Sequence, residues 1–312
     1  MRLRLGTRGS LLAITQSRWV ASRLEETRGL KVELEVIRTS GDLQQDRPLS
    51  EIGGKGLFTK ELDLALLDGK IDLAVHSLKD LPTCLPEGVS IGAVSEREDP
   101  RDVLIGPPGT LVTLDSLAEG ARVGSSSLRR AALLRATRPD IKVRDIRGNL
   151  DTRIRKLERG EVDAIVVAAA GVRRLGWSDR VSEYLDPGSW LPAPGQGALG
   201  IVVRTEELNQ VPWLRSLDHL PSRVATTAER TLLEVLDAGC RLPVAALGLL
   251  FGEGLRLKGM VAHPDGTLVI RAEGTGTQDD PSSLGETVGG ELLDRGANLL
   301  LDDLRDGEAI GG

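Results

Sequence analysis

An alternation of strand-like and helix-like segments occurs twice in this 312-residue chain and limits the folds that it can adopt. In the first stretch, the pattern predicts strands over 2–6, 31–38 and 71–75 and helices over 10–28 and 56–68. In the second stretch, it predicts strands over 122–124, 142–146 and 163–169 and helices over 127–137 and 150–159. Strands that alternate with helices build a mainly parallel sheet, so each stretch predicts an α/β domain.

Two passages of unusual composition mark the limits of these stretches. Charged residues gather over 96–101 (EREDPR), and prolines and glycines over 191–198 (LPAPGQGA). A strand predicted over 199–204 follows the second passage, and we expect it to return to the first domain. A third region holds a helix over 225–236, a loop with Cys240, strand-like stretches and a terminal helix from 284 to about 303. The predicted domains are α/β domain 1 (1–97 and 195–216), α/β domain 2 (98–194) and a smaller C-terminal α+β domain (217–312).

Composition argues against several classes of protein. The chain has 40 basic and 46 acidic residues, a net charge of −6, which disfavours non-specific nucleic-acid binding. No apolar run reaches the length of a membrane span, and the N-terminus lacks the cleavage site of a signal peptide. We therefore expect a cytoplasmic protein with neither a nucleic-acid nor a membrane partner. Two cysteines argue against a disulfide framework, and three scattered histidines predict no metal site.

The stretch GSSSLRR, residues 124–130, places three serines and two arginines where a strand leads into a helix. Free N–H groups and hydroxyls at such a point can bind an anion. Arg129 and Arg130 lie in the first helical turn, where the helix dipole favours acidic groups by roughly 0.3–1 kcal/mol. A bound anion would supply the missing negative charge. The alternative is a serine-capped helix with solvated arginines.

A second cluster, VRDIRGNLDTRIRK, covers residues 143–156. Arg147 follows a strand, and Arg153 and Arg155 lie in the helix after it. Arginine rather than lysine favours bidentate contacts with planar carboxylates. The alternative is a solvated helix face, which is more plausible for Arg155 than for Arg147.

A third cluster combines the first strand-to-helix junction, with Arg8 and Ser10, and the glycine-rich loop GGKG over 53–56. The loop lacks the spacing of a phosphate loop or a dinucleotide-binding motif, so a mobile lid, an anion-binding loop and a plain hinge all stay open. Ligands of open α/β sheets gather where strands end and helices begin. The three clusters together predict a ligand with several carboxylates or phosphates between two α/β domains.

The stretch AVHSLKDLP, residues 74–82, places Lys79 and Asp80 where a buried strand ends. We expect Asp80 to be partly desolvated, although nearby cations leave the direction of its pKa shift open. A carboxylate in a cationic cleft can stabilise positive charge at the reacting atom of a ligand. The alternatives are an exposed pair of Lys79 with Asp80, or Asp80 as the cap of a short turn.

Six motifs along the chain resemble those of the porphobilinogen deaminase family, also called hydroxymethylbilane synthase. They are IGGKGLF, VHSLKDLP, GSSSLRR, RGNLDTR, PGQGALG and AGCRLP, and they span nearly the whole chain. The resemblance implies two domains like those of periplasmic binding proteins flanking an active-site cleft, and a smaller third domain. It also implies a monomer with a dipyrromethane cofactor joined by a thioether to Cys240. This primer is extended by four porphobilinogen molecules, which lose ammonia and leave as hydroxymethylbilane for haem biosynthesis.

The same resemblance assigns roles to individual residues, with Asp80 as the catalytic carboxylate and no metal. The cofactor-binding set is Cys240, Lys79, Asp80, Ser127, Arg129, Arg130 and Arg153. The substrate-binding set is Arg8, Ser10, Arg147, Arg153 and Arg174, and the cleft loop contributes Lys55 and Phe58. The sequence departs from the family pattern at Glu51, Pro194, Val202 and Ala238, which concerns loops and packing more than chemistry.

Two other functions fit parts of the sequence. A non-enzymatic binding protein for a small carboxylate would explain the arginines, but not Cys240 or the third domain. A nucleotide-using transferase would need a phosphate-loop motif, which the sequence does not contain.

Overall fold

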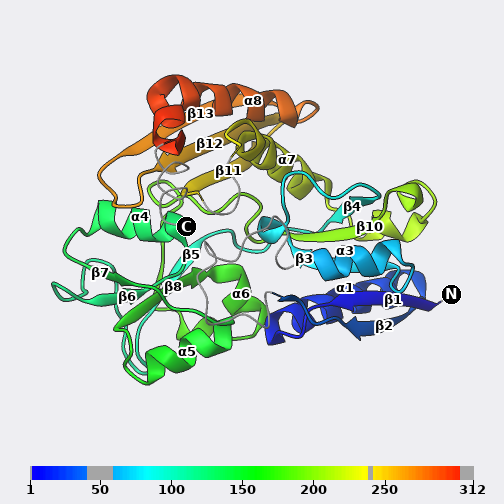
Figure 1. The fold of residues 1–312 in the computed structure, drawn as a ribbon, viewed down its shortest axis with the longest axis horizontal. Coiled ribbons are helices and arrows are strands. Elements are labelled where there is room, and N and C mark those ends of the chain that lie inside the picture. Colours follow the sequence, from blue (N-terminus) through cyan, green and yellow to red (C-terminus); the bar gives the residue numbers. More distant parts are fainter. Residues whose placement is uncertain (1, 41–58, 238–241, 303–312) are drawn as a thin grey trace. The chain divides into compact units, whose positions relative to one another are not determined.

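The structure, a computed structural model, describes residues 2–40, 59–237 and 242–302 (Figure 1). The chain divides into two compact units. Unit 1 is Met1–Glu98 with Gly197–Arg223, and unit 2 is Asp99–Gln196 with Val224–Gly312. The charged passage and the proline- and glycine-rich passage of the sequence therefore mark places where the chain passes between the units.

Unit 1 contains a five-stranded sheet of order β2-β1-β3-β10-β4. Its strands are β1 (Arg2–Thr7), β2 (Lys31–Val36), β3 (Leu73–Ser77), β4 (Val89–Val94) and β10 (Leu199–Arg204). Strand β1 is parallel to β2 and β3, whereas β10 is antiparallel to β3 and β4. The helical segments are α1 (Leu11–Arg28), α3 (Lys60–Leu67) and the short turns η1 (Leu78–Asp80), η3 (Thr205–Glu207) and η4 (Pro212–Ser216). Helices α1 and α3 pack in separate apolar clusters that include alternate residues of β3, so they cover opposite faces of the sheet.

Unit 2 contains a second five-stranded sheet, of order β7-β6-β8-β5-β9. Its strands are β5 (Asp102–Ile105), β6 (Arg122–Gly124), β7 (Lys142–Arg144), β8 (Ala164–Ala168) and β9 (Glu183–Tyr184). The helical segments are α4 (Leu128–Thr137), α5 (Leu150–Glu158), α6 (Ala169–Arg174) and η2 (Ser178–Arg180). As in unit 1, three adjacent strands run parallel, and an antiparallel strand, here β5, lies beside them. Strands β5 and β10 each follow a passage between the units.

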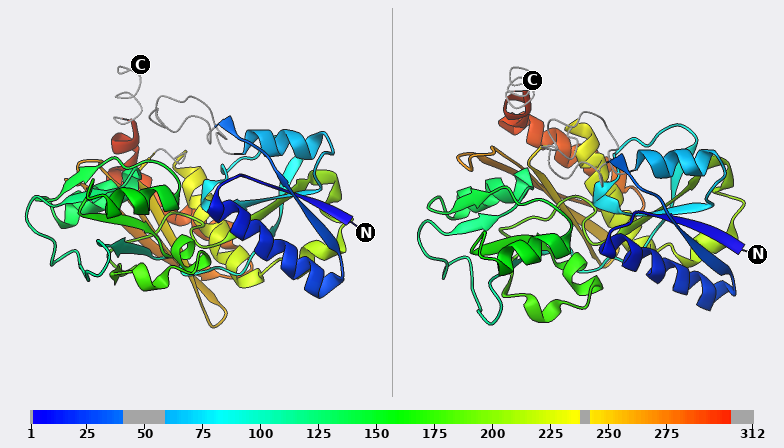
Figure 2. Two further views of the ribbon diagram at one scale, coloured as in Figure 1. Left: turned by 90° about the horizontal axis from the view of Figure 1, so that it is seen from below. Right: turned by 60° about the horizontal axis from the view of Figure 1, so that its bottom comes forward.

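The C-terminal part of the chain, which belongs to unit 2 from Val224 onward, is an antiparallel meander with helices packed on it. It consists of α7 (Leu220–Val235), β11 (Val244–Phe251), β12 (Gly254–Ala262), β13 (Val269–Thr277), α8 (Pro281–Leu292) and a π-helical turn, η5 (Leu293–Ala297). Helix α8 lies along β12 and β13 (Figures 1 and 2) and buries Val288 and Leu292 against Leu232 and Leu257. The two α/β sheets and this α+β part confirm the expected fold class.

Two predicted helices begin earlier than expected, and both have proline in their first turn. Helix α7 begins at Leu220 instead of 225, and α8 begins at Pro281 instead of 284, where Asp280 caps it by accepting a hydrogen bond from the Ser283 N–H (3.1 Å). Proline fits the first turn of a helix, where its missing N–H has no helical partner. Among the described residues, no helix combines the length and the apolar character needed to cross a membrane.

Candidate active site

In unit 1, the predicted polar residues lie at one edge of the sheet. Arg8 and Ser10 follow β1, and Lys79 and Asp80 lie in η1, directly after β3; because β1 and β3 are parallel neighbours, their carboxyl ends share this edge. The hydroxyl of Ser10 caps α1 by accepting a hydrogen bond from the backbone N–H of Ala13 (3.2 Å). The structure thus brings together two segments about 70 residues apart in sequence.

Asp80 differs from the expectation that it is partly desolvated. Its side chain is exposed, while Leu78, in the same short turn, is fully buried. Leu78 packs in the apolar cluster with Leu62 and Leu81. The two residues that follow it lie outside this cluster, so Lys79 is half-buried and Asp80 is exposed. The prediction of a partly desolvated carboxylate was therefore wrong, because the apolar strand ends before Asp80.

His76 is a polar residue at this edge that the sequence analysis did not use. It is 5% exposed, and among the described residues its Nε2 atom has no hydrogen-bond partner. Burial, together with the positive charge of Arg8, lowers the pKa of His76 to about 4. The imidazole is therefore neutral at pH 7. The burial of His76 could have been predicted from the sequence, because this residue lies within an apolar strand.

In unit 2, the predicted residues also gather where parallel strands end. Ser125–Ser127 follow β6, Arg147 follows β7, and Arg174 ends α6, which follows β8. The N–H of Ser125 donates to the carbonyl of Arg144 (2.9 Å), and the hydroxyl of Ser126 donates to the carbonyl of Ile146. Hydrogen bonds thus join the motif GSSSLRR to the segment directly before RGNLDTR.

The arginines of the second motif have partners within the protein. Arg147 pairs with Asp145 (Nε to Oδ2, 2.8 Å), and the Nε of Arg153 donates to the carbonyl of Gly148 (2.8 Å). Burial raises the pKa of Asp145, but hydrogen bonds from Arg147 and Ser126 and the charges of Arg147 and Arg153 lower it below its ordinary value.

Arg155, on the same helix, forms an exposed ion pair with Asp151 one turn away (3.0 Å). For Arg155 the alternative of a solvated helix face is therefore confirmed.

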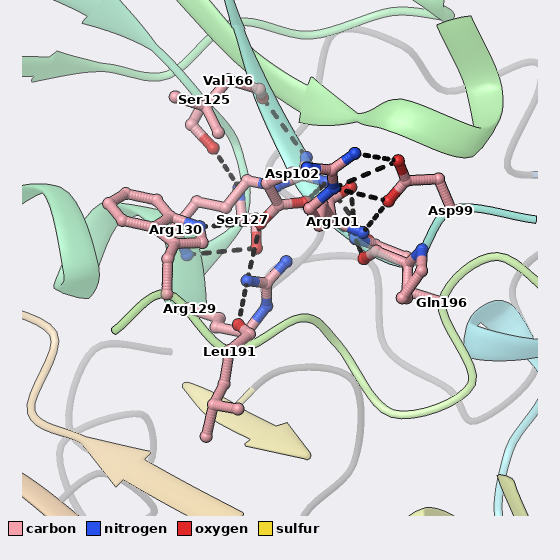
Figure 3. Close-up of polar contacts among 12 residues, drawn as sticks. Asp99, Arg101, Asp102, Ser125, Ser127, Arg129, Arg130, Val166, Leu191 and Gln196 are labelled. Carbon is pink, nitrogen blue, oxygen red and sulfur yellow. Dashed lines mark hydrogen bonds and ion pairs between the residues drawn. The ribbon is translucent and has the colours of Figure 1, made fainter. Parts of the chain in front are cut away.

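Arg129 and Arg130 are buried, with exposed fractions of 4% and 6%. The alternative of solvated arginines is therefore wrong, although Ser127 does cap α4. Both guanidinium groups bind the carboxylate of Asp102, at 2.7 Å (Arg129 Nη1 to Oδ2) and 2.8 Å (Arg130 Nη2 to Oδ1). Figure 3 shows the side chains of Arg129, Arg130 and Gln196 gathered around Asp102.

Asp102 thus supplies negative charge that the sequence analysis had assigned to a ligand. Burial raises the pKa of Asp102, but the two guanidinium groups outweigh burial and hold it well below its usual range. Asp102 was not among the predicted site residues. The available signal was a carboxylate directly before the apolar run Val103–Ile105, because an acid that opens a buried strand needs a partner.

Comparison with known proteins identifies the family. A family model described as "Porphobilinogen deaminase, dipyromethane cofactor binding domain" matches residues 3–211. A second, "Porphobilinogen deaminase, C-terminal domain", matches residues 224–294. The chain belongs to the porphobilinogen deaminase family. The first match covers both candidate edges, and the second covers most of the C-terminal part.

Individual relatives match over nearly their full length. The porphobilinogen deaminase of Syntrophobacter fumaroxidans is 48% identical over 303 residues, 97% of each chain. That of Desulforudis audaxviator is 50% identical over 305 residues, 97% of this chain and 98% of the relative. Among solved structures, the methionine-binding protein MetQ aligns with a TM-score of 0.43 and 13% identity, covering 69% of this chain and 88% of that one.

The residues of unit 2 fit a cofactor with acidic groups, and the family model names a dipyrromethane cofactor. Arg129, Arg130 and Asp102 together carry one net positive charge. The Nε atoms of Arg129 and Arg130 are buried and have no hydrogen-bond partner among the described residues. A carboxylate is the group that such donors bind best. Three predicted site residues, Lys55, Phe58 and Cys240, lie outside the described residues, whereas Cys84 is an exposed free thiol.

Proposed function

We propose that this protein condenses four porphobilinogen molecules head to tail into hydroxymethylbilane, starting from a dipyrromethane primer on Cys240. Each condensation forms one carbon–carbon bond between pyrrole units and breaks two bonds, the carbon–nitrogen bond of the substrate and a carbon–hydrogen bond of the ring that it joins. The amino group leaves as ammonia, the ring hydrogen leaves as a proton, and water finally releases the product. The observation that carries the proposal is the partly neutralised arginine pair at the carboxyl edge of the second sheet, in a chain of this family.

Binding of the pyrrole rings depends on cations, because each ring carries an acetate and a propionate group. We assign the acidic groups of the primer to Lys79, Ser127, Arg129, Arg130 and Arg153, with Cys240 as the attachment point. We assign the incoming substrate to Arg8, Ser10, Arg147, Arg153 and Arg174. All the described members of both sets lie beyond the carboxyl ends of parallel strands or in the helices that follow them. When bound, the dipyrromethane supplies the pyrrole carbon to which the first substrate is joined.

Asp80 is the catalytic carboxylate in this proposal. Its exposed side chain lies beside Lys79 at the carboxyl edge of the first sheet, where a ligand can reach it. There it accepts hydrogen bonds from pyrrole N–H groups and assists the departure of ammonia. It also stabilises the positive charge that the substrate gains when ammonia leaves. Lys55 and Phe58 are assigned to a loop over the cleft.

The proposal includes three domains with the predicted boundaries, 1–97 with 195–216, 98–194 and 217–312. The presence of one sheet in each supports this division. We also propose a cytoplasmic monomer, as the family resemblance implies. Sedimentation analysis at several protein concentrations tests the monomer, and fractionation of source cells tests the location.

The decisive experiment is the intact mass of the purified protein together with an assay for ammonia release. We expect the added mass of a dipyrromethane, located on a Cys240 peptide, and ammonia released from porphobilinogen. Cys240→Ser should lose both the added mass and the activity. Cys84→Ser is the matched control and should keep both, because that exposed thiol lies in no proposed contact. An unmodified wild-type chain with full activity would exclude the tethered-primer mechanism.

A further inference from the structure

Asp102 is a buried carboxylate that the assignments above do not use. It is the first residue of β5, all four residues of which are buried, and its own exposed fraction is 0%. An ionised carboxylate in such a position is strongly destabilising unless charged and polar partners surround it. The groups that surround the Asp102 carboxylate therefore indicate which side chains its charge stabilises.

Four donors from three different parts of unit 2 surround this carboxylate. Oδ2 accepts from Arg129 Nη1 (2.7 Å) and from the indole Nε1 of Trp190 (2.9 Å). Oδ1 accepts from Arg130 Nη2 (2.8 Å) and from Gln196 Nε2 (2.9 Å). Four hydrogen bonds use the full acceptor capacity of a carboxylate, so Asp102 has none left for a ligand.

The two arginines, by contrast, keep unused capacity. Among the described residues, no second carboxylate forms an ion pair with either guanidinium, so the pair retains one net positive charge. Their Nε atoms are buried without a hydrogen-bond partner in the described part of the chain. Arg129 also donates to the carbonyl of Leu191 (2.7 Å), and Arg130 to that of Val166 (3.3 Å), which fixes both side chains.

We propose that Asp102 is a positioning residue for the cofactor: it holds Arg129 and Arg130 side by side and cancels one of their two charges, so that one carboxylate of the dipyrromethane completes the neutralisation. This inference rests on the proposed function. Without Asp102, two buried guanidinium groups would repel each other. Burial already lowers the pKa of Arg129, and the charge of Asp102 opposes that change.

The test compares Asp102→Asn with two controls in the same region. Asp102→Asn keeps the size of the side chain but raises the net charge of the cluster from one to two. Asp99→Asn removes a neighbouring carboxylate that pairs with Arg101 (2.7 Å) and Arg173 (3.6 Å). Trp190→Phe removes a hydrogen-bond donor to Asp102 without changing any charge.

The readout is the fraction of purified protein that carries the cofactor mass, together with KM and kcat of the loaded fraction. We expect Asp102→Asn to lower that fraction at least about tenfold, because a buried charge loses its partner. Asp99→Asn and Trp190→Phe should stay within about twofold of the wild type. Equal loading in Asp102→Asn, or an equal loss in Asp99→Asn, would overturn the inference.

A double variant, Asp102→Asn with Arg129→Gln, returns the cluster to one positive charge. Its thermal midpoint should recover at least half of the loss that Asp102→Asn causes, and it should fold even if the single variant does not. No recovery, or failure of the double variant to fold, would show that charge neutralisation is not the role of Asp102.

The wild type separates the two proposals. If it carries no cofactor mass and releases no ammonia, the proposed function fails. If it does both, and Asp102→Asn does so equally well, only the role of Asp102 fails.

Discussion

Glu229 and Gly195 are joined inside unit 2 by a hydrogen bond of 2.6 Å, from the Gly195 N–H to the Glu229 carboxylate. The other carboxylate oxygen accepts from the N–H of Gly248 (2.7 Å), and Glu229 is fully buried. Glu229 lies in α7, Gly195 in the proline- and glycine-rich passage, and Gly248 in β11. One side chain thus fixes this passage to both elements that flank residues 238–241.

Glu229→Gln should destabilise the protein by about 1–3 kcal/mol, because the amide group of glutamine can accept from only one of the two N–H groups and leaves the other unsatisfied. Urea unfolding followed by circular dichroism measures this change. Glu234→Gln, at an exposed position on the same helix, is the control and should stay within about 0.5 kcal/mol of the wild type. Equal stability of both variants would contradict a structural role for the buried carboxylate.

Gly197→Ala should be more damaging than alanine at another left-handed glycine. Gly197 has φ +97°, and a Cβ atom there would lie well inside contact distance of the Glu98 carbonyl oxygen. We expect a loss of about 2–4 kcal/mol from backbone strain and the clash together. Gly176→Ala, at φ +72° with no atom within 4 Å of the added Cβ, isolates the strain and should lose about 1–2 kcal/mol. Thermal unfolding of both variants gives the comparison, and a smaller loss at Gly197 would refute it.

His76 should make stability depend on pH between about 6.5 and about 4. In this window the unfolded chain binds a proton at this histidine and the folded chain does not, so stability falls as the pH falls. The difference between the two pKa values corresponds to about 3 kcal/mol once the pH is below both. Ion-paired carboxylates such as Asp72 and Asp163, with lowered pKa values, lose their contribution at lower pH.

Urea unfolding of the wild type and His76→Gln at about pH 7, 5.5 and 4.5 tests this dependence. Glutamine cannot take up a proton, so the variant should lose less stability than the wild type between the highest and the lowest of these pH values. If the free energy of unfolding changed with pH by the same amount in both proteins, His76 would not have the lowered pKa in the folded state.

Asp80→Asn should leave the fold intact and remove most of the activity. The side chain is exposed, so stability should stay within about 0.5 kcal/mol. We expect the initial rate of ammonia release to fall about 10²–10⁴-fold, with the cofactor mass retained. Glu87→Gln, a second exposed carboxylate a few residues further on, should keep the wild-type rate. A wild-type rate in Asp80→Asn would identify that carboxylate as a bystander.

Local structure followed closely from the sequence. The predicted strands over 122–124 and 199–204 match β6 and β10. Ser10 and Ser127 cap the helices α1 and α4, which were predicted at these positions. Strand ends and helix caps depend on residues close together in the chain, so periodicity and capping preferences can predict them. Most of the described candidate residues were found by similar reasoning, because polar side chains that follow buried strands gather at one edge of a sheet. Arg174, by contrast, came only from the family resemblance.

The partners of those residues depended on tertiary structure. Asp102 lies 27 residues before Arg129 and 94 before Gln196, and no local pattern connects them. They meet because β5 lies antiparallel beside β8, and Asp102, the first residue of β5, contacts Arg129 at the start of α4 and Gln196 in the proline- and glycine-rich passage. The exposure of Asp80 likewise depends on Leu78, which packs into the core. The sequence by itself determined the family, the secondary structure and the candidate residues, whereas only the order of strands decided which charges were paired inside the protein, because the energy of a buried charge depends on neighbours distant in the chain.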